Sequence, residues 1–155
     1  ICLKLWEIIF INTEPLISLL FCISRCLHFQ EALLAITQQE MSRCLTELHC
    51  RSNFSVKSIT EYMLPETKEA FYLHMEGKTA QLIIRPAFEV FSSELATLAG
   101  VHAKYDYYHN AEMTRFPKRL HKSLNETHYG LAFSFDTLEA VQQFIARLSA
   151  IVKGT

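Results

Sequence analysis

The sequence has 155 residues, of which half are apolar and a fifth are charged, and its formal net charge is −1. This composition excludes an intrinsically disordered chain, and the near-zero charge argues against a dedicated, strongly basic DNA-binding domain. A chain of this length suits one domain that buries roughly two thirds of its unfolded surface. We predict a single domain over residues 1–155, with a helical part at 1–50 and an α+β part at 66–155.

The first fifty residues carry two helical patterns. The run Asn12-Thr13-Glu14-Pro15 has the capping hydroxyl, early acid and first-turn proline of a helix start, which predicts a helix to about His28. Residues 29–50 repeat an amphipathic pattern, which predicts a second helix that ends at Arg51-Ser52-Asn53. The apolar surface of these helices suits a core or a homodimer interface.

The same region predicts no membrane span. The apolar run Leu16–Ile23 is too short to cross a bilayer, and the first residues lack the basic start and cleavage site of a signal peptide. A membrane-associated start is the less favoured alternative. The chain begins at Ile1 with no methionine before Met41, which leaves open a fragment, a processed product or a frame opened upstream of the natural start.

The cysteines favour a reducing, cytoplasmic setting, because an odd and clustered set is not a disulfide framework. Zinc binding by these thiols with His28 and His49 is the alternative. The Cys22-x3-Cys26 spacing is wider than a zinc knuckle, however, and buried thiols on amphipathic helices are commoner. We therefore predict no metal and no other cofactor. The five cysteines are Cys2, Cys22, Cys26, Cys44 and Cys50.

The middle of the chain predicts a hairpin and a helix. Residues 71–75 and 80–85 have the pattern of two strands around Glu76-Gly77, with a helix over 66–75 as the alternative. Residues 55–64 have no clear pattern. From Phe88 to Leu98, apolar residues three and four apart predict a helix, and Gly100 suits its left-handed cap.

The end of the chain predicts a strand followed by a helix. Apolar and small residues alternate from Tyr129 to Phe135, which is typical of a half-buried strand. Asp136-Thr137-Leu138-Glu139 then resembles a capping box in which the Asp136 carboxylate accepts the Glu139 amide. The fold class that we predict is α+β: N-terminal helices pack on a small, three- to four-stranded, mostly antiparallel sheet, with a C-terminal strand–helix unit.

Between these elements lies a segment rich in tyrosine and basic residues. Residues 104–122 hold five Lys or Arg against Asp106 and Glu112, a local net charge of +3. Aromatic rings interleaved with cations can stack on bases and neutralise phosphates, so we predict an anionic partner, nucleic acid among the candidates. The alternative is an ordinary solvated loop with half-buried tyrosines. The candidate binding residues are Tyr105, Tyr107, His109, Arg115, Lys118, Arg119, His121 and Lys122.

Catalysis has weaker support. The sequence has no glycine-rich phosphate loop, no His-Glu-x-x-His and no Gly-x-Ser-x-Gly motif. The histidines, acids and cations of the segment are nonetheless the residue types that a metal-independent ribonuclease uses. In that case His109, Glu112 and His121 would be its acid–base groups. The same residues also make an ordinary polar loop, so we assign no catalytic residue and favour a protein that is not an enzyme.

One local resemblance bears on the ribonuclease alternative. The runs Tyr105-Asp106, His109-Asn110-Ala111 and Phe116-Pro117-Lys118, followed by His121-Lys122, resemble the TumE-type toxins of bacterial toxin–antitoxin pairs. Those proteins have a Tyr-Asp-Asn-Ala stretch, a histidine-rich Phe-Pro segment and a short C-terminal helix. The resemblance covers residues 105–147, under a third of the chain. It implies an RNA-cleaving toxin.

The chain also departs from that family. Tyr107 and Tyr108 interrupt the first motif, and Lys118 and Arg119 stand where histidines are expected. Three functions therefore stay open: a binding or regulatory domain that meets an anionic partner through residues 104–122, a small ribonuclease-like toxin, and a homodimeric protein-interaction or small-ligand module. The first is our prediction.

Overall fold

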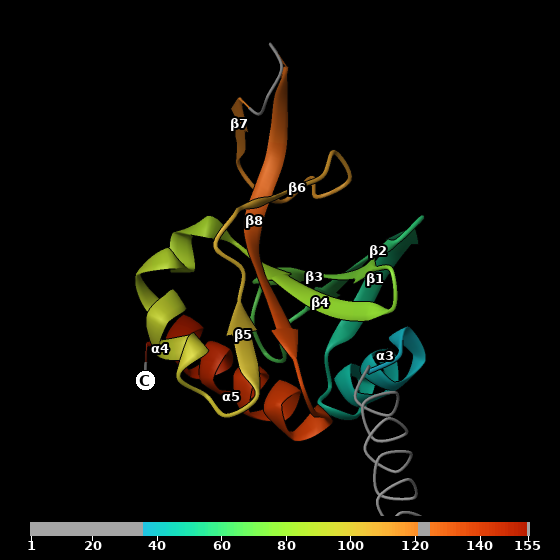
Figure 1. Ribbon diagram of the computed structural model, residues 1–155, viewed down its shortest axis with the longest axis vertical. Coiled ribbons are helices and arrows are strands. Elements are labelled where there is room, and N and C mark those ends of the chain that lie inside the picture. Colours follow the sequence, from blue (N-terminus) through green and yellow to red (C-terminus); the bar gives the residue numbers. More distant parts are fainter. Residues whose placement is uncertain (1–35, 121–124, 155) are drawn as a thin grey trace, which may run out of the picture. The chain divides into compact units, whose positions relative to one another are not determined.

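The computed structural model describes residues 36–120 and 125–154, without the side chain of Glu76 (Figure 1). The helix that the sequence predicts from Asn12 to His28, the N-terminal dimer face and the candidate zinc ligands Cys22, Cys26 and His28 lie outside the described residues. So do His121 and Lys122. No helix within the described ranges is long and apolar enough to cross a membrane.

The described part is built on one antiparallel sheet of eight strands, in the order β1-β2-β3-β4-β8-β5, with β6 and β7 also paired to β8. The prediction of a three- to four-stranded sheet is therefore wrong. The strands are β1 (Arg51–Val56), β2 (Ile59–Met63), β3 (Ala70–Glu76), β4 (Thr79–Ile84), β5 (Val101–Ala103), β6 (Tyr108–His109), β7 (Lys118–Leu120) and β8 (Glu126–Phe135).

The β3–β4 hairpin follows from local sequence. Its strands pair in register from Tyr72–Ile83 to Glu76–Thr79, and Gly77 takes the positive φ of +61° that the turn requires. The alternative helix over 66–75 is wrong. The predicted helical pattern ends before residues 51–53, as expected, because α3 stops at Glu47. These residues begin β1, an exposed edge strand that the sequence did not predict because its burial does not alternate.

Helices cover one face of the sheet. They are α3 (Gln38–Glu47), the 3₁₀ helix η1 (Pro86–Phe91), α4 (Ser92–Ala96) and α5 (Leu138–Lys153). Thr37 caps α3 in a capping box with Glu40. The single helix predicted from 88 to 98 is divided between η1 and α4. Thr137, not Asp136, caps α5, and its hydroxyl accepts the Ala140 amide.

The sheet has an apolar core on each face. The helix-side core includes Leu45, Phe71, Leu82, Phe133, Phe144 and Leu148. The second face is covered by residues 110–117, which we call the plug loop. The plug-side core consists of Ile59, Tyr72, Ile83 and Ala132 from the strands with Met113 and Phe116 from the plug loop.

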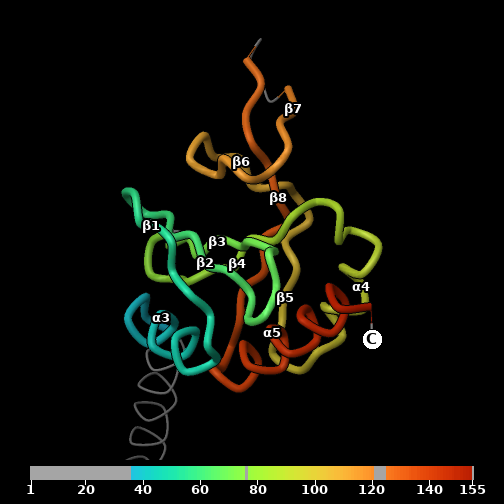
Figure 2. Tube along the Cα trace, turned by 180° about the vertical axis from the view of Figure 1, so that it is seen from behind, coloured from blue at the N-terminus to red at the C-terminus, as the bar shows by residue number. Residues whose placement is uncertain are grey.

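Strand β8 connects two parts of the sheet. Residues 131–135 pair with β4 on one edge and β5 on the other, whereas residues 126–130 pair with β7 and β6. Figures 1 and 2 show β8 continuing past β4 and β5 to meet β6 and β7. We call β6, β7 and residues 126–130 the extension. It holds four of the basic and aromatic residues of the 104–122 segment: Tyr108, His109, Lys118 and Arg119.

Candidate functional site

The extension places one set of predicted site residues on the helix side of the sheet. His109 lies opposite Tyr129, and Arg119 lies opposite Thr127. Residues two apart on a strand share a face, so Thr127 and Tyr129 continue the face of Leu131, which packs against the helix-side core. Arg119 and His109 therefore project to this side.

A second set projects to the opposite side. Lys118 lies opposite His128, and Tyr108 lies opposite Gly130. Tyr108 packs against the plug-side core, which identifies this face. Side chains alternate along β7, so Lys118 and Arg119 point away from each other. The basic segment therefore does not form one continuous positive surface.

On the helix side, four residues form what we call the tyrosine–arginine cluster: Tyr107, His109, Arg119 and Tyr129. The guanidinium carbon of Arg119 lies 4.6 Å from the ring centroid of Tyr107 and 5.2 Å from that of Tyr129. The two tyrosine rings meet edge to face at 5.3 Å, and the His109 ring stacks on Tyr129 at 6.1 Å. These are ordinary distances for cation–π and aromatic pairs.

The cluster leaves the hydrogen-bonding edge of Arg119 available. A guanidinium contacts an aromatic ring through its flat face, whereas its five N–H donors lie in its plane. Within residues 36–120 and 125–154, no carboxylate forms an ion pair with Arg119. The arrangement can accept an oxyanion in the guanidinium plane.

Glu89 of η1 fixes the position of Tyr107. The Tyr107 hydroxyl donates a hydrogen bond of 2.5 Å to Glu89 Oε1. This hydrogen bond is the main reason that the pKa of Tyr107 is raised above its ordinary value. Sequence reasoning missed Glu89 and the role of Tyr129. The position of Tyr129 at the start of the alternating strand was the available signal.

A cleft of about 630 Å³ adjoins the cluster. Residues of η1 and α4 line it together with β5, residues 104–107 and Leu131, Ala132 and Phe133 of β8. Tyr107 belongs to both the cleft and the cluster, and Tyr105, which is fully exposed, lines the cleft as well. The volume lies in the range of ligand-binding pockets.

His102, one of the residues that line the cleft, pairs with a carboxylate. His102 Nε2 lies 2.8 Å from Asp136 Oδ2, and both side chains are more than half exposed. Such a pair can act as a general base when it also contacts a nucleophile. No hydroxyl or thiol in the described part of the chain hydrogen-bonds to His102, so the geometry does not form a catalytic triad.

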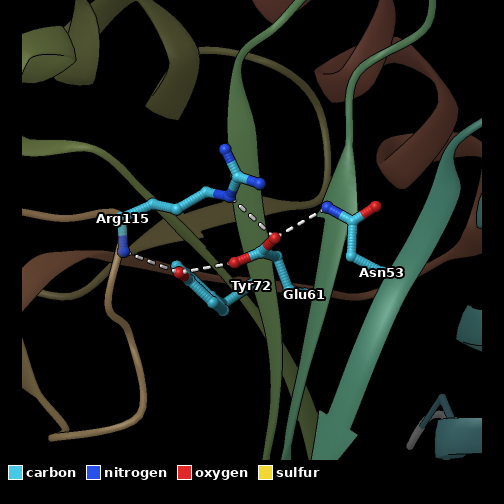
Figure 3. Close-up of polar contacts among 4 residues, drawn as sticks. All are labelled: Asn53, Glu61, Tyr72 and Arg115. Carbon is cyan, nitrogen blue, oxygen red and sulfur yellow. Dashed lines mark hydrogen bonds and ion pairs between the residues drawn. The ribbon is translucent and has the colours of Figure 1, made fainter.

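Arg115 serves a different site from Arg119. Its Nε donates to Oε1 of Glu61 at 2.9 Å, and Asn53 Nδ2 donates to the same oxygen at 2.7 Å. Tyr72 donates its hydroxyl to Oε2 at 2.8 Å and accepts the Arg115 amide at 3.2 Å (Figure 3). We call these four residues the Glu61 network. Burial is the main reason that the pKa of Tyr72 is raised to about 12.

The Glu61 network fastens the plug loop to the sheet. Glu61 is 1% exposed, and its three donors come from β1, β3 and the plug loop. Sequence reasoning missed Glu61, for which the only signal was a carboxylate inside the run Ile59-Thr60-Glu61-Tyr62-Met63. Glu112, another candidate acid–base residue, lies in the plug loop, where its backbone amide donates to Asn110 Oδ1 at 2.9 Å.

No known protein family, curated protein or solved structure is significantly similar to this chain.

Proposed function

We propose that this chain is a non-catalytic binding domain that recognises an anionic group of a partner through Arg119. The observation that carries the proposal is a guanidinium held between the rings of Tyr107 and Tyr129, with donors that no described carboxylate engages. The rings restrain the side chain before binding, which lowers the entropic cost of ordering it. An oxyanion in the guanidinium plane gains charge-assisted hydrogen bonds.

The expected contribution of this contact is measurable. A hydrogen bond to a charged group contributes about 1.5–3 kcal/mol, which is roughly ten- to a hundredfold in affinity. We expect Arg119→Ala to weaken binding by at least about tenfold. Arg119→Lys should recover only part of the loss, because an ammonium neither stacks on tyrosine nor binds an oxyanion through two parallel donors.

The test uses two fluorescent probes, a short polyglutamate peptide and a single-stranded oligouridylate, titrated at several salt concentrations. Arg43→Ala is the matched control, since it removes the same charge from an exposed position on α3. Binding that depends on Arg119 but not on Arg43 supports the proposal. If Arg119→Ala binds the probes as tightly as the unaltered protein does, Arg119 is not an anion site. The same conclusion follows if the unaltered protein binds neither probe.

The oligouridylate also tests the ribonuclease alternative. In the described part, the His109 ring stacks on Tyr129 and Glu112 belongs to the plug loop, so no observation brings these acid–base candidates together. We expect the probe to remain intact during the titration. Cleavage that is lost in His121→Ala would instead favour the toxin that the local resemblance implies.

A further inference from the structure

We infer that the anionic partner is an acidic peptide in an extended conformation, which adds as a strand to β5 and reaches Arg119 with a carboxylate. This inference rests on the proposed function, because it uses the same arginine. It adds the class of partner and the backbone groups that bind it.

Strand β5 presents an open edge. It is the last strand in the sheet order, and it pairs only with β8 in the described part of the chain. Lys104 N donates to Ala132 O, and Asp136 N donates to Gly100 O, both at 2.9 Å. The backbone groups of Gly100 and Lys104 therefore face β8. Because these groups alternate between the two sides of a strand, Val101 and Ala103 direct their N–H and C=O away from β8.

Ala103 is the outward donor that β5 offers. The other outward amide, that of Val101, donates to Leu98 O at 3.1 Å. Ala103 is exposed and lines the cleft, so an extended chain that enters the cleft passes next to this residue. An added strand satisfies such groups through its own main chain, which is the basis of β-strand addition.

The opposite edge of the sheet is less suited to this role. In β1, the pairing with β2 shifts between Ser52 and Phe54, which marks a β-bulge. A bulge twists an edge strand and interrupts its row of donors and acceptors, a common protection against pairing with other chains. β5 has no such irregularity over its three paired residues.

The cleft connects the β5 edge to the arginine. Its wall runs from Val101 through Lys104 and Tyr105 to Tyr107, and the Tyr107 ring lies under the Arg119 guanidinium. A peptide that follows this wall meets the main-chain groups of β5 and then the cluster. A carboxylate on the peptide matches the guanidinium of Arg119, which pairs with no carboxylate in residues 36–120 and 125–154, and β5 supplies partners for the peptide main chain.

A nucleic acid fits these observations less well. Its affinity comes from many phosphate contacts on a continuous basic surface. Arg119 and Lys118 point to opposite faces of the extension, so the basic side chains do not form such a surface. The outward N–H and C=O of Ala103 can instead form hydrogen bonds with the C=O and N–H of a peptide backbone.

The test begins with peptides selected from a displayed random library on the unaltered protein. We expect the enriched sequences to contain an acidic residue in a stretch rich in β-branched residues. Each is then synthesised with a fluorescent label. Arg119→Ala and Ala103→Pro should each weaken its binding by about tenfold, since proline removes the outward donor of an edge strand and leaves the bonds to β8 intact.

Hydrogen exchange on the unaltered protein gives a second measurement that needs no variant. The Ala103 amide should exchange more slowly when the peptide binds, whereas the Lys104 amide, already bonded to β8, should change little. An unchanged Ala103 amide would overturn the inference, even if Ala103→Pro failed to fold.

The outcomes also separate this inference from the proposed function. Peptides that need Arg119 but bind Ala103→Pro normally would overturn strand addition and leave the anion site in place. Peptides that need neither residue would overturn both. Failure to enrich any acidic peptide, with oligouridylate still binding through Arg119, would overturn the inference and leave nucleic acid as the partner.

Discussion

A buried carboxylate is costly unless its oxygens are bonded, and Glu61 meets that condition with donors from three separate elements. Arg115 is the only cation among those donors, and its side chain is half exposed, whereas the carboxylate is 1% exposed. Removing Arg115 would therefore leave a charge inside the protein with only neutral partners. Mutation of Arg115 reports on stability as well as binding, so it is a poor test of ligand recognition.

We expect Arg115→Ala to lower the free energy of unfolding by about 2–3 kcal/mol, because breaking a buried ion pair leaves its partner uncompensated. The matched control is Arg147→Ala. Arg147 pairs with Glu94 where both side chains are more than 40% exposed, so its loss should cost less than about 1 kcal/mol. Urea denaturation measures both. Equal losses would show that the Glu61 network adds nothing beyond an ordinary surface pair.

Gly130 is a residue that the packing requires. A Cβ there would lie 2.6 Å from Ile83 Cγ2, 2.8 Å from the Ile84 carbonyl oxygen and 2.8 Å from Phe116 Cε2. Gly130→Ala should cost about 1–3 kcal/mol through overpacking. Gly77→Ala has open space around its Cβ, so its cost of about 1 kcal/mol would come from the positive φ alone. A Gly130 variant as stable as the unaltered protein would contradict the close packing of the plug loop.

Among the elements, α5 shows how a local pattern can be displaced by a tertiary contact. The sequence places the cap at Asp136, but that carboxylate pairs with His102 of β5. Thr137 takes the N-cap position instead and accepts the Ala140 amide at 3.2 Å. The helix itself runs from Leu138 to Lys153 and ends at Gly154, whose φ is +75°.

We expect Thr137→Ala to cost about 1 kcal/mol, the usual penalty for losing an N-cap side chain. Asp136→Ala should cost less, because it removes only a pair that is more than half exposed on both sides. Thermal unfolding of the two variants separates the assignments. A larger loss of stability for Asp136→Ala than for Thr137→Ala would show that Asp136 is the N-cap residue, as the sequence indicates.

The stability of the whole described part should fall in alkali. Burial raises the pKa of Tyr72 from 10.0 to about 12, and burial raises that of Cys50 from 9.0 to about 12. Both groups are neutral when protonated, so the folded protein holds these protons more tightly than the unfolded chain. Their contribution is complete below the lower unfolded value, 9.0, and is lost as the pH rises toward 12.

Urea midpoints measured across this alkaline range should therefore decline steadily. Tyr72→Phe with Cys50→Ala should start from a lower midpoint and lose less of it with rising pH, because both ionisable groups are gone. A decline of the same slope in the double variant would assign the alkaline sensitivity to other residues.

How much of the molecule can be predicted follows from the range of its contacts. The hairpin around Gly77, the strand within Tyr129–Phe135 and the C-terminal helix depend on neighbouring residues, so periodicity and turn chemistry indicate them. Strands β6 and β7 have two and three residues, too few for a pattern, and exist because β8 pairs with them. The sequence also marks residues 104–122 as unusual, but their faces depend on that pairing.

The Glu61 network could not be predicted from the sequence either, because it depends on contacts between residues far apart in the chain. Arg115 and Glu61 are 54 positions apart, and nothing local indicates that they meet. The charge of Arg115 made it resemble Arg119 in the sequence. The two arginines differ in the face of the sheet on which they lie. Arg115 fastens the plug loop through Glu61 on one face, whereas Arg119 contacts tyrosine rings on the other.

The continuity of β8 limits how this protein can be re-engineered. The strand that supports the extension also supplies Phe133 and Phe135 to the helix-side core. The extension therefore cannot be removed or transferred to another protein as an independent unit. A transferred extension would have to continue a central strand of the protein that receives it, as it continues β8 here. Diversifying the outward side chains at fixed strand length is the route by which specificity can change without dismantling the scaffold.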